Sequence, residues 1–197
     1  GQPLELLPWQ AWVIGSVLCW KHTKDNGRRY KACWIECARG AGKTSLAATL
    51  LLHCGFQYEG ADVLCLANTV QQARQAFDQA NSMGRAAFGD LNDPEADGVG
   101  ELRITERKTV VVPTKAKIRP YASKTSTLDG LKGLAYILDE TSEAKADGMF
   151  AKIESATQKL RDSFFVSITT PDGIENGRDS PYYQRRRTAV QALETEE

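Results

Sequence analysis

The sequence has few of the residues that build metal centres and covalent cross-links. It contains two histidines and five cysteines, and no two cysteines stand in the CxxC spacing of zinc and redox motifs. A structural zinc site takes four clustered cysteine or histidine ligands, which this spacing does not supply. We therefore expect buried free thiols in a reducing compartment, without disulfides or bound zinc.

The chain also lacks a net charge and a long hydrophobic run. Its 25 basic and 25 acidic residues balance, so any contact with nucleic acid requires a local patch. The longest uncharged stretches, residues 6–20 and 44–58, have 15 residues each, fewer than the roughly 20 of a membrane helix. No signal peptide precedes them, and we expect a cytoplasmic protein that contacts no membrane.

What the sequence does contain is an alternation of short apolar runs and helical segments. A hydrophobic share of 42% over 197 residues is that of a globular protein with its own core. Strands are predicted for residues 31–37, 62–67, 103–104, 109–112, 117–121, 134–139 and 164–169. Helices are predicted for residues 7–21, 44–54, 69–88, 149–160 and from 180 onward, with Gly55 ending the second, and a turn for residues 25–27. This order predicts an α/β fold with a mostly parallel central sheet flanked by helices.

A glycine-rich segment, residues 39–44 (Arg-Gly-Ala-Gly-Lys-Thr), lies between the first strand and the second helix. In that context glycines let the backbone curl around an anion, and the helix N-terminus favours phosphate. The loop predicts that Lys43 reaches the β- and γ-phosphates of a nucleotide and that the Thr44 hydroxyl ligates Mg²⁺. The usual pattern has glycine five positions before Gly42, where this sequence has Cys37. The alternative is a tight strand–helix turn with a chance lysine.

An acidic pair, Asp139 and Glu140, directly follows the apolar run of residues 134–138. The carboxyl ends of buried parallel strands form the edge at which α/β proteins bind ligands. We expect Asp139 to hold Mg²⁺, directly or through water, and Glu140 to orient and deprotonate the attacking water. The alternative is an ordinary first helical turn, which acidic residues also favour.

In this order, the motifs resemble the N-terminal ATPase domain of the large terminase subunit of tailed bacteriophages, the DNA-packaging motor. Residues 7–10 (Leu-Pro-Trp-Gln) are similar to its adenine-recognition segment, with Gln10 as the base reader. Arg39 before Gly-Lys-Thr is a hallmark of its phosphate loop, and residues 138–140 match its Walker B motif and catalytic glutamate. Residues 168–170 (Ile-Thr-Thr) resemble the coupling motif, whose threonine senses the γ-phosphate, and residues 180–183 resemble the stretch after it.

This resemblance implies a RecA-like P-loop NTPase of the ASCE type, an ATP hydrolase with ATP and Mg²⁺ as cofactors. The catalytic residues it implies are Glu140, Lys43 and Arg39. The nucleotide-binding residues it implies are Trp9, Gln10, Arg39, Gly40, Ala41, Gly42, Lys43, Thr44, Ser45, Asp139, Thr169 and Thr170, with Thr44 and Asp139 on the metal.

The resemblance also implies partners and a division of the chain. It implies translocation of double-stranded DNA into a procapsid, in the cytoplasm of the bacterial host. The expected partners are that DNA, neighbouring copies in a homo-oligomeric ring, the small terminase subunit and the portal protein. Residues 1–180 would form the ATPase domain, and residues 181–197 a helix or linker toward a nuclease domain that these 197 residues do not contain. Nuclease activity is therefore not expected from them.

The sequence leaves the residue that acts on a neighbour's nucleotide open. Related motors often have a basic residue before a glycine about ten positions ahead of the Walker B aspartate, where this chain has Asp129-Gly130. Candidate substitutes are Arg103, Arg119, Lys124 and Lys132. The basic stretch of residues 103–132 faces DNA or the next subunit in one interpretation, and is a set of solvated strand faces in the other.

Two other functions remain open at this stage. One is half of a helicase, which uses a similar upstream glutamine, phosphate loop and acidic pair. The other is a non-catalytic nucleotide-binding module that serves as an assembly scaffold. The three arginines at 185–187 point in different directions on a helix, so we expect solvation and a linker role for them, without a joint anion site.

Overall fold

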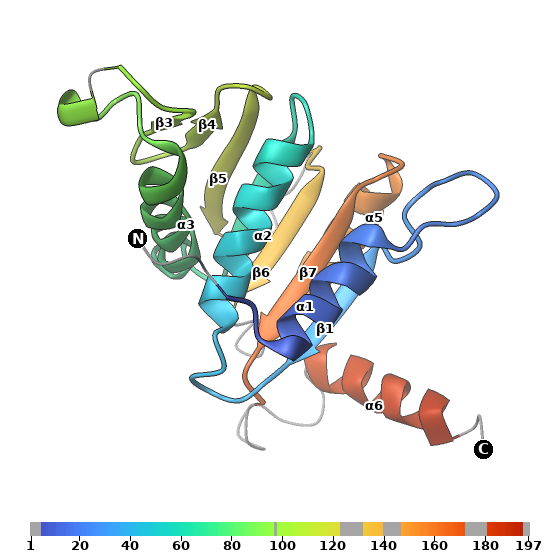
Figure 1. Ribbon diagram of the computed structural model, residues 1–197. Coiled ribbons are helices and arrows are strands. Elements are labelled where there is room, and N and C mark those ends of the chain that lie inside the picture. Colours follow the sequence, from blue (N-terminus) through green and yellow to red (C-terminus); the bar gives the residue numbers. More distant parts are fainter. Residues whose placement is uncertain (1–4, 97, 123–131, 140–146, 172–180, 195–197) are drawn as a thin grey trace.

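A single mixed sheet forms the centre of the computed structural model, which describes residues 5–96, 98–122, 132–139, 147–171 and 181–194 (Figure 1). Within these residues the strands are β1 (Ala32–Glu36), β2 (Asp62–Ala67), β3 (Leu102–Ile104), β4 (Thr109–Val111), β5 (Ala116–Ala122), β6 (Ala135–Asp139) and β7 (Phe164–Thr169). Their order across the sheet is β1-β7-β6-β2-β5-β4-β3. The first five of these are parallel, and β4 and β3 add an antiparallel extension. The predicted mostly parallel sheet is confirmed.

Helices cover both faces of this sheet (Figure 1). They are α1 (Pro8–Ile14) with a π-helical continuation η1 (Gly15–Cys19), α2 (Lys43–Gln57), α3 (Val70–Phe88), the short 3₁₀ helix η2 (Pro94–Ala96), α5 (Asp147–Gln158) and α6 (Pro181–Glu194). As predicted, α3 begins after Thr69, whose hydroxyl accepts a hydrogen bond from the backbone N–H of Gln72. In the part of the chain that the structure describes, no helix has the length and apolarity to cross a membrane.

The strand β2 shows how the sequence fills the two layers of the core. Val63 and Cys65 pack in the cluster that contains α1, α2 and α3, whereas Leu64 and Leu66 pack with α5 on the opposite face. This alternation follows from the two-residue period of a strand. Because both faces are covered, the strand is continuously apolar, as buried parallel strands are.

Gly55 does not end α2, and that prediction is wrong. The helix continues to Gln57, and Gly55 is buried within it. A Cβ at Gly55 would lie 2.9 Å from Cγ2 of Val111 and 3.2 Å from Cδ1 of Ile118. The residue is therefore a glycine because α2 packs closely on β4 and β5, and not because the chain turns there.

Candidate nucleotide-binding site

The carboxyl ends of three neighbouring strands bring the predicted motifs together. In the sheet β7 lies between β1 and β6, with Glu36 opposite Thr169 and Asp139 opposite Ile168. The backbone N–H of Cys37 donates to the carbonyl of Thr169 at 3.1 Å, which continues this pairing into the loop after β1. The phosphate loop, Asp139 and Thr169 thus share one edge, where open α/β sheets bind ligands.

The loop between β1 and α2 has the backbone of an anion site. Gly40 and Gly42 have φ angles of +81° and +82°, a left-handed conformation that other residues rarely adopt. Gly42 is the residue before the first turn of α2. The first N–H groups of a helix have no carbonyl partner within it, and here they follow the curled loop. With Arg39 and Gly40 exposed beside them, these groups form a site suited to phosphate oxygens.

Lys43 lies across this loop and is only 7% exposed. Its ammonium donates to the carbonyl oxygen of Ala38 at 3.1 Å and to that of Cys37 at 3.5 Å. The side chain is therefore already positioned over the loop, on acceptors that a phosphate oxygen could replace. That position agrees with the role predicted for Lys43.

The next two residues of α2 differ in their surroundings. Thr44 is half-buried in the first helical turn, beside the loop. The Ser45 hydroxyl accepts a hydrogen bond of 2.8 Å from the side-chain amide of Gln79 on α3. The structure therefore links Ser45 to α3, and its contact with a nucleotide stays a prediction. Gln79 is absent from the sequence prediction, because nothing in a single sequence pairs residues 34 positions apart.

Asp139 is the last residue of β6 and is 5% exposed. A carboxylate at this edge, with the Thr44 hydroxyl at the start of α2, is a hard oxygen donor set of the kind Mg²⁺ takes from proteins when phosphates and water supply the other ligands. The residues present therefore fit that ion. Glu140, the predicted general base, lies outside the described residues.

The two threonines of the predicted coupling motif end β7. Thr169 is 1% exposed, and its hydroxyl donates to the carbonyl oxygen of Thr170 at 3.2 Å. Thr170 is half-buried one residue beyond the strand. Through its backbone carbonyl Thr169 contacts the start of the phosphate loop at Cys37. This hydrogen bond joins the start of the phosphate loop to the end of β7.

Gln10 connects the N-terminal helix to the phosphate loop. Its side chain is 5% exposed, accepts from the backbone N–H of Leu7 at 2.9 Å and donates to the carbonyl of Gly42 at 3.4 Å. Trp9 is half-buried against the core. Trp12, in the same helix, is 72% exposed. The sequence prediction thus placed Gln10 and Trp9 near the site, and Gln10 touches the loop itself.

Residues 8–190 match the sequence profile of the family described as the terminase large subunit, ATPase domain. The chain belongs to this family. No curated protein matches it by sequence. The fold class inferred from the motifs, a RecA-like P-loop NTPase, is confirmed by the sheet, the family and the solved structures that follow.

Three solved structures share this terminase ATPase fold. The large terminase of bacteriophage HK97 has a TM-score of 0.67 and 24% identity over 86% of this chain and 34% of that one. The ATPase domain of the large terminase of Thermus phage P74-26 has a TM-score of 0.58 and 19% identity over 75% and 62% of the two chains. A large terminase from a thermophilic bacteriophage, in complex with ATP-γ-S, has a TM-score of 0.58 and 8% identity over 82% and 38%. The chain thus spans 34% to 62% of the length of these relatives.

The basic residues of the stretch 103–132 that the structure describes do not form one patch in this terminase domain. Arg103 and the residues 107–108 lie on β3 and its turn to β4, whereas Lys115 and Lys117 lie at the other end of β4. Arg119 pairs with Asp62 at 2.8 Å and donates to the Tyr121 hydroxyl at 2.8 Å. Arg103 and Lys132 are exposed, and Lys124 and Asp129-Gly130 lie outside the described residues.

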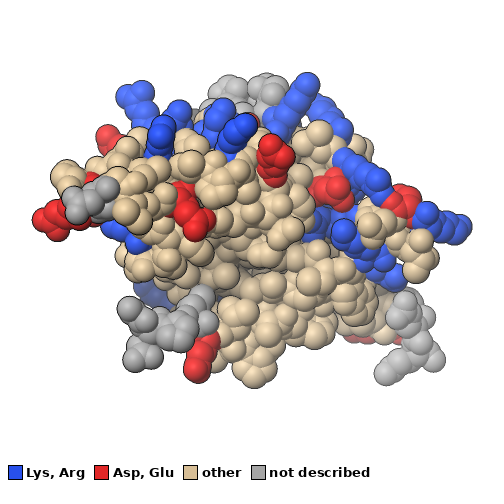
Figure 2. Space-filling model, turned by 45° about the horizontal axis from the view of Figure 1, so that its top comes forward, with Lys and Arg blue, Asp and Glu red and all other residues tan. Residues whose placement is uncertain are grey.

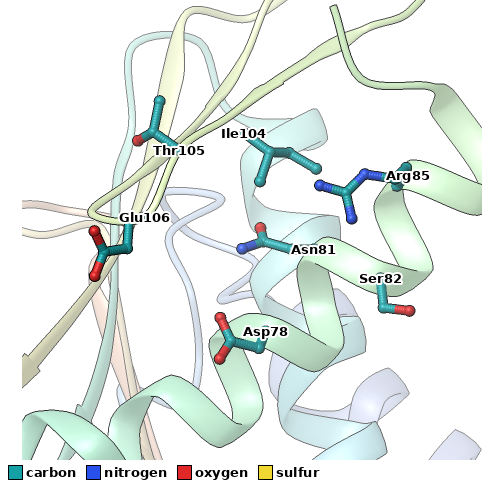
Figure 3. Close-up of a pocket in the computed structure, with 7 residues that line it drawn as sticks. All are labelled: Asp78, Asn81, Ser82, Arg85, Ile104, Thr105 and Glu106. Atoms are coloured by element: carbon teal, nitrogen blue, oxygen red, sulfur yellow. The ribbon is translucent and has the colours of Figure 1, made fainter. Parts of the chain in front are cut away.

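A pocket lies between α3 and the turn from β3 to β4, with a volume of about 390 Å³ (Figure 3). Its lining side chains are Asp78, Asn81, Ser82, Arg85, Ile104, Thr105 and Glu106. Arg85 pairs with Asp90 and Glu106 with Arg74, so these two charged groups already have partners. None of the predicted nucleotide residues lines this pocket.

The cysteines are free thiols, as predicted, but they are not uniformly buried. Cys54 and Cys65 are buried, Cys33 and Cys37 are half-buried, and Cys19 is exposed. Burial raises the pKa of Cys33 to about 11 and that of Cys54 to about 12, so both thiols stay protonated at neutral pH. Among the described residues no cluster of three or more His, Cys, Asp or Glu could hold a metal ion.

The arginines of α6 contact different elements. Arg186 pairs with Glu36 at 3.1 Å, at the carboxyl end of β1. Arg185 pairs with Glu154 on α5 and lies over the Trp34 ring. They do not converge on one anion site, in agreement with the sequence prediction. The contact with Glu36 was not predicted, and it places α6 beside the strand end that leads into the phosphate loop.

Proposed function

We propose that this terminase ATPase domain binds ATP with Mg²⁺ at the carboxyl edge of the sheet and hydrolyses it. The observation that carries the proposal is that β1, β6 and β7 bring the phosphate loop, Asp139 and Thr169 to one edge. The ATP analogue bound to the relative from a thermophilic bacteriophage supports ATP as the ligand.

Hydrolysis here depends on positioning and charge stabilisation. The loop N–H groups hold the phosphates, and the Lys43 ammonium exchanges the carbonyls of Ala38 and Cys37 for phosphate oxygens. Arg39, exposed at the loop, adds positive charge on the γ-phosphate side. The Thr44 hydroxyl and Asp139 would hold Mg²⁺, which neutralises charge on the phosphates. Glu140, the next residue after Asp139, would orient the attacking water and take its proton.

The hydrolysis cycle would drive movement of double-stranded DNA into a procapsid. In that role the domain works in the cytoplasm of the bacterial host, in a ring of neighbouring copies, with the small terminase subunit and the portal protein as partners. The hydrogen bond between Cys37 and Thr169 supports the coupling role of Thr169, because it joins the phosphate loop to the end of β7.

The test is ATP hydrolysis measured against protein concentration, with Glu140→Gln as the inactive reference. A rate per subunit that rises with concentration and disappears in Glu140→Gln supports an active site completed by a neighbouring copy. A rate equal to that of Glu140→Gln at every concentration contradicts catalysis by this domain. Binding of a fluorescent ATP analogue to Glu140→Gln shows whether the nucleotide site survives the substitution.

A further inference from the structure

Residues 20–30 form a short hairpin at the amino end of β1 (Figure 1). Its two arms are joined by the antiparallel bridge between Lys21 and Arg28 and by the bond from Arg29 N–H to the Trp20 carbonyl at 3.0 Å. The turn covers residues 23–25 and so overlaps the predicted turn at residues 25–27 only at Asp25, and Asn26 directly after it is in the left-handed region at φ +56°. The chain enters β1 directly after this hairpin, so hairpin and phosphate loop lie at opposite ends of the same strand.

Arg28 fixes the hairpin to the body of the domain. Its guanidinium is 5% exposed and donates to the Val17 carbonyl and the Tyr58 hydroxyl, each at 2.6 Å, and to the Asp162 carbonyl at 3.2 Å. It also lies 4.1 Å from the centre of the Phe164 ring. Each of these acceptors is uncharged, and burying an arginine on such acceptors costs free energy. These contacts fix the hairpin to the domain, and the other basic side chains of the hairpin are exposed.

Exposed basic side chains lie at the amino ends of β1, β7, β6 and β5, and we call them the basic band. They are Lys21, Lys24 and Arg29 on the hairpin, Lys159 and Arg161 before β7, Lys132 before β6, and Lys115 and Lys117 at the start of β5. Exposed or half-exposed acidic residues along this edge are fewer: Asp25, Glu59, Asp62, Glu101 and Asp162, of which Glu59 and Asp62 lie just before and at the start of β2. Figure 2, with the top of Figure 1 brought forward, shows Lys and Arg spread across this face and fewer Asp and Glu between them.

The hairpin also exposes two aromatic rings within the band. Trp20 and Tyr30 are 53% and 39% exposed, and their ring centres are 6.0 Å apart. Arg29 lies 5.6 Å from the centre of the Tyr30 ring. Exposed aromatic rings beside arginine and lysine are typical of surfaces that bind single-stranded nucleic acid, which makes a single strand the competing ligand for this surface.

We propose that the basic band binds the phosphate backbone of double-stranded DNA. The proposal rests on the proposed function for the identity of the polyanion. From β1 to β5 the band crosses four inter-strand spacings of about 4.8 Å, or about 19 Å. Phosphates of one DNA strand recur about every 3.4 Å along the helix axis, so a duplex segment of this length contains about five phosphates of each strand. Its basic side chains are numerous enough to neutralise that set.

The basic band and the candidate nucleotide site lie at opposite edges of the sheet, and β1 connects them. With five residues and a rise of about 3.3 Å each, β1 spans about 16 Å between the hairpin and the phosphate loop. A DNA segment on the band would therefore lie at the opposite edge of the sheet from the nucleotide. The surface is distinct from the turn between β3 and β4, where Arg103, Arg107 and Lys108 form a separate basic cluster.

The experiment measures binding of a labelled DNA duplex of about 30 base pairs by fluorescence anisotropy at several salt concentrations. The test variant replaces Lys21, Lys24 and Arg29 by Gln. Its matched control replaces Arg107, Lys108 and Arg187 by Gln, with the same change in charge outside the band. Each lost phosphate contact should reduce the magnitude of the slope of log K against log salt by about 0.9. The magnitude should therefore fall by about 2.7 in the test variant and stay at the wild-type value in the control.

Four results would overturn the proposal. Two concern the variants: an unchanged slope in the test variant, or a loss of slope confined to the control variant. The other two are tighter binding of a single strand than of the duplex, and absence of salt-dependent binding by the wild-type chain. If the hairpin variant unfolds, Lys159→Gln with Arg161→Gln on a separate turn is expected to lower the slope by about 1.8.

ATP hydrolysis by the same samples separates the two proposals. A domain that hydrolyses ATP but fails these binding tests keeps the proposed function and loses this surface. A domain that binds through the band but does not hydrolyse ATP keeps the surface and loses the function.

Discussion

The contact between Gln10 and the phosphate loop can be tested by placing a methyl group on each of the two loop glycines. Gly40 and Gly42 have the same left-handed φ within one degree, so a substitution by alanine strains both equally. A left-handed residue other than glycine costs about 1–2 kcal/mol. A Cβ at Gly40 meets no atom within 4 Å, whereas a Cβ at Gly42 would lie 2.9 Å from the Gln10 amide nitrogen. Among the contacts that the added methyl group makes, the two substitutions thus differ in the one with Gln10.

The expected difference follows from the bonds that Gln10 makes. To clear the new methyl group, its side chain must leave the Gly42 carbonyl at 3.4 Å and shift its bond with the Leu7 N–H at 2.9 Å. Loss of hydrogen bonding of this kind costs about 1 kcal/mol. We therefore expect Gly42→Ala to lower the free energy of unfolding by about 1 kcal/mol more than Gly40→Ala.

The assay is urea unfolding of both variants in the wild-type and Gln10→Ala backgrounds, a double-mutant cycle. In Gln10→Ala the methyl group at position 42 has no amide to meet, so the two glycine substitutions should cost the same. Equal costs in both backgrounds would refute the role of Gln10 as a tie to the loop. A change in the denaturant slope would instead show that the loop variants alter the unfolded state.

Two further predictions concern packing and acid stability. Gly55→Ala should gain up to about 1 kcal/mol of helix propensity but lose more through the close contact of its methyl group with Val111, so thermal melts should show net destabilisation. A methyl group at Gly15 meets no atom within 4 Å, so the control Gly15→Ala should be neutral or stabilising. Burial alone would raise the pKa of Asp90, but backbone hydrogen bonds and Arg85 outweigh burial, so the pKa is lowered overall. This carboxylate therefore stabilises the fold above about pH 4 and loses that effect as pH falls. The difference in unfolding free energy between wild type and Asp90→Asn should therefore shrink on acidification, and a difference independent of pH would contradict this.

The elements that could be predicted from sequence are those whose environment is encoded locally. The runs at residues 62–67 and 164–169 are strands with the bounds predicted, because a strand buried on both faces is apolar at nearly every position. The start of α3 at Thr69 was predicted from its capping residue, which acts within four positions. The phosphate loop was predicted for a similar reason, since glycine, lysine and threonine there are adjacent in sequence.

The features that could not be predicted are contacts between distant segments. Because helices often end at glycine, the sequence predicted that α2 ends at Gly55. Gly55 instead packs against β4 and β5, a contact that exists only in the assembled sheet. The burial of Arg28 was not expected, because arginine is mostly exposed and its acceptors come from three separate segments. The exposure of Trp12 likewise contradicts the usual burial of tryptophan in an amphipathic helix.

A net charge of zero predicted that bulk charge would not attract DNA, and the fold shows why this does not exclude a local site. Folding moves basic residues from sequence positions as distant as 21 and 161 to one edge of the sheet. The strand β1 connects that edge to the phosphate loop and pairs only with β7 among the strands described. Its carboxyl end is held by the pairing of Glu36 with Arg186 and by the backbone bond between Cys37 and Thr169. Because its amino end continues into the hairpin, β1 is one covalent route by which a change at the nucleotide would reach the basic band.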